Sequence, residues 1–124
     1  MTTLYVCETC RFSADAQEDA HGRRGGALLA EQVEQLAADD PSLTVRRMRC
    51  LMACRRHCVV YVRAPGKMGY VIGDFPPQAE SAATLLEYAR HYRQSDTGVV
   101  PYAHWPEGIK GHFIARVPPL DEQK

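Results

Sequence analysis

Apolar residues recur at helical spacing in two stretches of the chain. The first is residues 27–37, where positions i, i+4, i+7 and i+8 of the stripe are Leu29, Val33, Leu36 and Ala37. The second is residues 79–92, after two adjacent prolines, and its inward stripe consists of Ala82, Leu85, Leu86, Ala89 and Tyr92. This period gathers apolar side chains on one side of a helix. The pattern predicts two amphipathic helices packed against a core.

Short apolar runs predict four strands. Residues 4–6 and 43–48 lie before and after the first helix, and the second run alternates apolar residues with arginine. Residues 59–62 and 69–72 flank the turn Ala64-Pro65-Gly66-Lys67, which is typical of a β-hairpin. The order is βαβ followed by ββα, and a strand, a crossover helix and a second strand favour a parallel pair.

This order predicts an α/β fold with a mixed four-stranded sheet and helices packed on it. A length of 124 residues suits a single domain. We interpret residues 1–97 as that domain. Residues 98–124 carry four prolines between aromatic and aliphatic residues, so we expect an irregular C-terminal extension packed on the same domain.

The charge and hydropathy of the chain indicate which kinds of partner and which cellular compartment to expect. The 15 basic and 15 acidic residues give a formal net charge of zero, which does not favour general attraction to nucleic acid or to anionic membranes. No stretch approaches the roughly 20 apolar residues that span a bilayer, and no basic segment with a long apolar run stands at the N-terminus. We expect a cytoplasmic protein with no nucleic-acid or membrane partner.

The five cysteines fall in two short stretches, Cys7-Glu-Thr-Cys10 and Cys50-Leu-Met-Ala-Cys54-Arg-Arg-His-Cys58. Near-neighbour pairs and an odd total are more typical of a metal centre than of a disulfide framework. The parallel pair of strands would bring Cys7, Cys10 and Cys50 to one edge of the sheet. Four thiolates can hold zinc or a 2Fe-2S cluster, and the three-residue gap of the second pair is less usual for zinc.

The second cysteine stretch and the segment after it resemble the signature of thioredoxin-like 2Fe-2S ferredoxins. That segment consists of Val59-Val60-Tyr61-Val62, a Pro-Gly turn and Gly69-Tyr70-Val71. The chain is more closely similar to the bacterial DUF1636 family, a group expected to bind metal. This closer resemblance rests on both cysteine stretches together with Gly26-Ala-Leu-Leu, Tyr70-Val-Ile-Gly-Asp and Gly98-Val-Val-Pro101.

This resemblance implies a thioredoxin-like fold, with Cys7, Cys10, Cys50 and Cys54 as the ligands of a 2Fe-2S cluster. It also implies one-electron transfer to a redox partner protein rather than enzymatic catalysis. The family is associated with cobalamin synthesis and cobalt handling, so the partner could belong to that metabolism. Related ferredoxins can be homodimers.

Two other functions stay open at this point. One is zinc or cobalt binding for delivery. The other is a thiol-disulfide oxidoreductase that uses Cys7 and Cys10, because such enzymes carry their nucleophile after the first strand of a thioredoxin-like fold. The polar stretch of residues 11–26 argues against the second, since no helix N-terminus directly follows Cys10 to lower a thiolate pKa.

Residues around the second cysteine stretch have two interpretations each. Cys58 is either a buried apolar residue or an alternative ligand, and His57 is a less favoured candidate ligand. Arg55 and Arg56 lie between two cysteines, so we expect them to tune the centre or to dock an acidic redox partner. Arg46 and Arg47 are equally consistent with that role and with a solvated strand.

Overall fold

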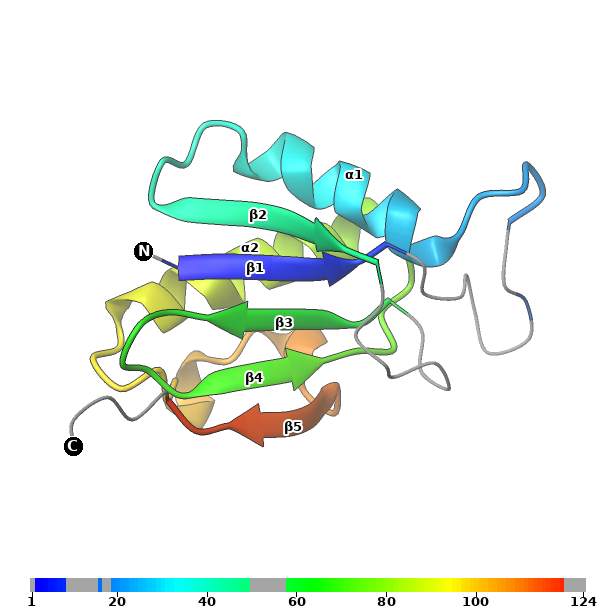
Figure 1. Cartoon of the computed structure of the whole chain (residues 1–124). Helices are drawn as coiled ribbons and strands as arrows, with labels where there is room; N and C mark the ends of the chain where they lie inside the picture. Colours follow the sequence, from blue (N-terminus) through cyan, green and yellow to red (C-terminus); the bar gives the residue numbers. More distant parts are fainter. Residues whose placement is uncertain (1, 9–15, 17–18, 50–57, 120–124) are drawn as a thin grey trace.

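The computed structural model describes residues 2–8, 16, 19–49 and 58–119. Along the chain these residues form β1 (Thr2–Cys7), α1 (Gly25–Ala37), β2 (Leu43–Met48), β3 (Val60–Arg63), β4 (Gly69–Ile72), α2 (Ala79–Gln94) and β5 (Phe113–Val117) (Figure 1). Two short 3-10 turns, Tyr102–His104 and Glu107–Ile109, lie between α2 and β5. The two predicted helices and four predicted strands are therefore present.

The strands form one mixed sheet in the order β2-β1-β3-β4-β5. Strands β1 and β2 are parallel, with Cys7 opposite Met48, and the remaining neighbours are antiparallel. The predicted βαβ unit followed by ββα is confirmed. The expected count of four strands is wrong, because Phe113–Val117 of the C-terminal extension pairs with the free edge of β4. The prolines around this segment favour an irregular conformation, and pairing with the available edge of β4 makes it a strand.

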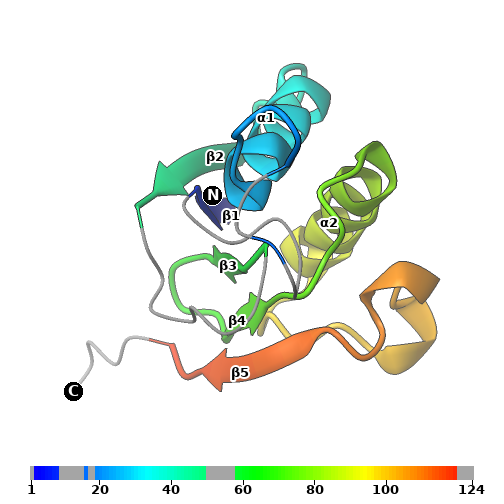
Figure 2. The same ribbon diagram turned by 90° about the vertical axis from the view of Figure 1, so that its right-hand side faces the viewer.

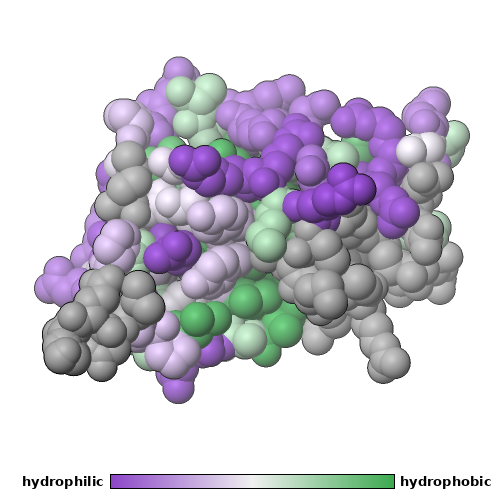
Figure 3. Space-filling model, viewed as in Figure 1, coloured by the Kyte–Doolittle hydropathy of each residue, from purple (hydrophilic) through white to green (hydrophobic). Residues whose placement is uncertain are grey.

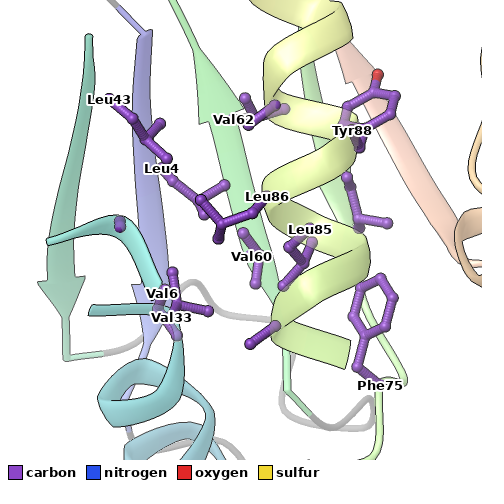
Figure 4. Packing of buried hydrophobic residues seen from close by; sticks show 14 of the residues in the cluster. Leu4, Val6, Val33, Leu43, Val60, Val62, Phe75, Leu85, Leu86 and Tyr88 are labelled. Atoms are coloured by element: carbon purple, nitrogen blue, oxygen red, sulfur yellow. The ribbon is translucent and has the colours of Figure 1, made fainter. Parts of the chain in front are cut away.

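Both helices cover the same face of the sheet (Figure 2). Leu4 and Val6 of β1 and Val60 and Val62 of β3 point into this layer (Figure 4). The stripe predicted for α2 is confirmed, because its five members are all at most 5% exposed. One turn of that helix is buried more completely than predicted, since Tyr88 is also only 2% exposed.

The stripe predicted for α1 is only partly correct. Leu29, Val33 and Ala37 are buried, but the side chain of Leu36 is 51% exposed. The buried side also contains Ala30. Helix α1 packs against α2 as well as against the sheet. The side of α1 that is buried therefore includes its small residues, and Leu36 lies at the margin of that side, in contact with solvent.

The opposite face of the sheet carries no helix among the described residues (Figure 2). Thr3, Tyr5 and Tyr61 lie on it, and the rings of the two tyrosines stack with their centroids 6.0 Å apart. Figure 3 shows this face, hydrophilic over β2 and β1 and more apolar over part of the β4 and β5 side. The cysteine-bearing end of β1 reaches the edge of this same face.

Gly98 locks the start of the C-terminal extension against the β3–β4 turn. Its φ is +86°, and a Cβ at this position would lie 2.6 Å from the carbonyl oxygen of Met68. The backbone N–H of Met68 also donates to the Thr97 carbonyl at 2.8 Å. Only glycine combines this left-handed conformation with so close an approach of two backbone segments.

We therefore expect Gly98→Ala to lower the free energy of unfolding by about 2–4 kcal/mol, from left-handed strain together with the steric clash. Gly66→Ala is the matched control, because Gly66 has a φ of +75° but nothing within 4 Å of its missing Cβ. It should lose only the strain contribution of about 1–2 kcal/mol. Urea denaturation measures both free energies of unfolding. Equal losses in the two variants would show that the steric clash with Met68 does not contribute to the loss of stability.

Candidate metal centre at the cysteine-bearing sheet edge

Three chain segments meet at the edge where the cysteine stretches begin and end. The backbone N–H of Cys7 donates to the carbonyl of Val59 at 3.0 Å, and that of Glu8 donates to the carbonyl of Met48 at 2.9 Å. These bonds tie the end of β1 to the end of β2 and to the start of β3. Cys10 follows Cys7 by three residues and Cys50 follows Met48 by two. Both cysteine stretches therefore adjoin the same edge.

Most of the predicted site residues lie outside the described residues. These are the predicted ligands Cys10, Cys50 and Cys54, together with Arg55, Arg56 and His57. Cys7 and Cys58 are described, and neither is in a disulfide. Within the described ranges, no three side chains of His, Cys, Asp or Glu gather closely enough to hold a metal ion. The four-cysteine ligand set stays a prediction.

The two described cysteines are neighbours that belong to different apolar clusters. Cys7 is 3% exposed and packs with Val59, flanked by Val71 and Ile114, in a small apolar cluster. Cys58 is fully buried and belongs to the main core beneath the helices. The sheet thus separates the surroundings of the two thiols.

The surroundings of Cys58 favour its neutral form. Burial raises the pKa of the Cys58 thiol to about 12, and the nearby Cys7 and Asp74 raise it further. Since desolvation penalises a thiolate, the thiol stays protonated near neutral pH. A neutral thiol surrounded by apolar side chains suits packing in the core, which is the first of the two interpretations of this residue.

Backbone strain marks the same edge of the sheet. Cys58 has a φ of 50° and Asp74 a φ of 67°, and these are the non-glycine residues with positive φ in the described part of the chain. Cys58 lies just before β3 and Asp74 just after β4, which pair through Val60 and Ile72. Such conformations cost about 1–3 kcal/mol each and tend to persist near functional sites. Asp74 was not among the site residues predicted from the sequence, and its only local signal was the preceding Gly73.

The two arginines considered together in the sequence have different roles. Arg47 lies on the helix side and donates from Nε and Nη2 to the carboxylate of Glu34 in α1, both at 2.8 Å. This hydrogen bond lowers the pKa of Glu34. Arg46 lies opposite Tyr5 in the parallel pair and so shares the helix-free face. Only Arg46 of the two is placed for a partner at that face.

Among the described strand residues, the charged side chains on the helix-free face are basic. Arg46 on β2 and Arg63 on β3 flank the central tyrosines, since Arg63 lies opposite Thr3 of β1. None of the five described strands contains Asp or Glu. Unbalanced charge of one sign steers and orients an oppositely charged partner.

Neither α1 nor α2 is long and apolar enough to cross a membrane, and the described part of the chain contains no helix that is.

Structural comparison places the fold among thioredoxin-like proteins. The chain is similar to a thioredoxin-like [2Fe-2S] ferredoxin from Aquifex aeolicus, with a TM-score of 0.57 and 17% sequence identity. The similarity covers 96% of this chain and 94% of the other. The predicted thioredoxin-like α/β fold is therefore confirmed, and at this identity the likeness concerns the fold alone.

Sequence comparison identifies the family. No curated protein matches the chain. The model of a family described as a protein of unknown function, DUF1636, matches residues 4–119. Because this match spans most of the sequence, the chain belongs to the DUF1636 family.

Proposed function

We propose that the protein binds a 2Fe-2S cluster and acts as a one-electron carrier. The observation that carries this proposal is the meeting of β1, β2 and β3 at the edge from which both cysteine stretches continue. The fold shared with a thioredoxin-like [2Fe-2S] ferredoxin supports it. Thiolates from two short stretches can converge on one small centre when both stretches adjoin the same sheet edge.

Cys7, Cys10, Cys50 and Cys54 would hold the cluster. When bound, it supplies a one-electron redox couple, so the protein takes one electron from a reduced donor protein and gives it to an oxidised acceptor, and no covalent bond forms or breaks. The apolar packing of Cys7 against Val59 limits water at one ligand. Backbone N–H groups and nearby arginines, including Arg55 and Arg56, would favour the reduced state by offsetting its added negative charge.

The redox partner we propose is a protein with an acidic docking surface. Arg46 and Arg63 on the helix-free face support this choice, because that face joins the edge where β1 ends at Cys7. Unbalanced positive charge also disfavours pairing of this face with an identical copy, so a homodimer would more readily use another surface. Cytoplasmic location and a partner in cobalamin or cobalt metabolism stay predictions from the sequence and the family resemblance.

Thiol-disulfide exchange at Cys7 and Cys10 is a less favoured function. Helix α1 begins at Gly25, well beyond Cys10 in the sequence, so its N-terminal dipole does not directly follow the pair. Zinc or cobalt would use the same thiolates as the cluster. Composition of the purified protein separates these alternatives.

The deciding experiment is anaerobic purification followed by iron and acid-labile sulfide assays and a visible spectrum before and after dithionite. We expect about two iron and two sulfide per chain and a reddish colour that fades on reduction. Zinc without sulfide would contradict the proposal in favour of a structural or delivery role. A metal-free protein with a reducible disulfide between Cys7 and Cys10 would contradict it in favour of thiol chemistry.

A further inference from the structure

A pocket of about 380 Å³ lies beside the edge strand β5. Its walls come from β4, β5, α2 and the start of the C-terminal extension, and the lining residues include Tyr70, Tyr88, Val100, Trp105, Phe113 and Arg116. Neither Cys7 nor Cys58 lines it. Its volume falls in the range of about 300–1,000 Å³ that is typical of small-molecule sites.

The walls of the pocket are mostly aromatic. The ring of Phe113 has its centroid 4.7 Å from that of Trp105, and it meets the rings of Tyr70 and Tyr88 edge-on at 5.5 and 5.7 Å. Tyr88 lies between α2 and the β5 side of the sheet (Figure 4). Rings arranged in this way offer both faces and edges to a further planar ring.

The aromatic wall is held in place before any ligand arrives. The indole Nε1–H of Trp105 donates to the carbonyl of Val100 at 2.8 Å. Val100 is itself buried, at 5% exposed, and so anchors the extension to the core. This segment runs beside α2 on the helix-covered side of the sheet (Figure 2). A preformed pocket loses little conformational freedom on binding.

Arg116 is the one cation among the residues that line this mostly apolar pocket. Arg116 lies directly opposite Tyr70 in the β4–β5 register, so the two side chains share the face that bears the pocket. Arg116 is exposed, and no acidic residue is among those that line the pocket. No ion pair with Arg116 occurs in the described part of the chain. A guanidinium in this position can donate two parallel N–H hydrogen bonds to the oxygens of a carboxylate.

We propose that this pocket binds a small planar aromatic acid, with its ring against Trp105 and Phe113 and its anionic group on Arg116. The aromatic walls select a flat apolar body, and the arginine selects a negative charge at one end of it. The site is separate from the proposed electron carrier function, and its test does not require a bound cluster.

Calorimetric titration of the full chain with 2-naphthoate tests the proposal, and neutral 2-naphthamide serves as the comparison ligand. We expect one saturable site for naphthoate and at least about tenfold weaker binding of the amide, because a charge-assisted hydrogen bond is lost. Arg116→Gln should weaken naphthoate binding by a similar factor and leave amide binding unchanged. Arg116 is exposed, so this variant keeps the core intact.

Arg90→Gln is the matched control, because Arg90 is an exposed arginine on α2 that does not line the pocket. It should bind naphthoate like the unmodified protein. Trp105 is the single tryptophan of the chain, so a naphthoate-dependent change in tryptophan emission that disappears in Trp105→Phe would place the ligand at this wall.

Absence of saturable naphthoate binding, or equal loss of affinity in Arg116→Gln and Arg90→Gln, would overturn the proposal. Sedimentation at the same protein concentrations provides an independent check. A dimer that excludes naphthoate would identify the pocket as a contact between two copies of the chain and would also overturn it.

Discussion

Replacement of Cys50 by serine is expected to remove nearly all of the iron and acid-labile sulfide from the anaerobically purified protein. A serine hydroxyl is a harder and far less acidic donor than a thiol, so it is a poor substitute among four thiolate ligands. Cys54→Ser should behave in the same way. The measurement is iron and sulfide per chain, together with the amplitude of the visible absorption.

Cys58→Ala is the matched control for these two variants. Cys58 lies fully buried in the main core, whereas Cys7 packs in the separate cluster with Val59. We therefore expect Cys58→Ala to retain its iron and sulfide and to lose only about 1 kcal/mol of unfolding free energy through the small cavity. Alanine is preferred to serine here because a buried hydroxyl would need a new hydrogen-bond partner.

The opposite pattern would reassign the ligands. Retention of the cluster in Cys50→Ser with loss in Cys58→Ala would make Cys58 a ligand and contradict its packing role. Loss in all three variants without any loss of thermal stability would show that every one of these thiols contacts the centre. Circular dichroism of each variant distinguishes ligand loss from failure to fold.

Leu29→Ala is expected to lower the free energy of unfolding by about 2–5 kcal/mol, through lost apolar burial and a residual cavity. Leu29 is fully buried, on the side of α1 that packs into the core. Because the substitution leaves an alanine, which favours helix, almost none of the loss should come from helix propensity. Urea denaturation followed by far-ultraviolet circular dichroism gives the value.

Leu36→Ala on the same helix provides the comparison. The side chain of Leu36 is 51% exposed, so we expect a loss of less than about 1 kcal/mol. Equal losses in the two variants would mean that α1 is rotated from its position in the structure. A change in the urea dependence of either variant would instead indicate an altered unfolded state.

The periodicity of the chain was sufficient to predict both helices and the first four strands. Apolar period and turn residues are local properties, so residues 79–92 and the hairpin around Pro65 and Gly66 could be located from the sequence alone. The crossover rule for parallel strands also predicts that Cys7, Cys10 and Cys50 lie near one edge of the sheet. The pairing of Cys7 with Met48 confirms the parallel strands, and the position of Cys10 and Cys50 stays a prediction.

Other features depended on which surfaces meet in three dimensions. Leu29 and Leu36 belong to the same stripe in the sequence, and only the packing of α1 on α2 decided which of them is buried. Strand β5 forms because β4 offers an unpaired edge to a segment far along the chain. Arg46 and Arg47 are neighbours, yet alternation along β2 sends them to opposite faces.

The sequence by itself therefore determined the order of the elements and the parallel pairing that ends β1 and β2 at one sheet edge, because both follow from local period and chain direction. The tertiary structure decided the burial of Cys58 and the aromatic pocket beside Arg116. Each of these depends on contacts between residues distant in the sequence, as in the approach of Trp105 to Phe113 and of Tyr88 to β5. No local pattern encodes such contacts, since they arise only when separate elements pack together.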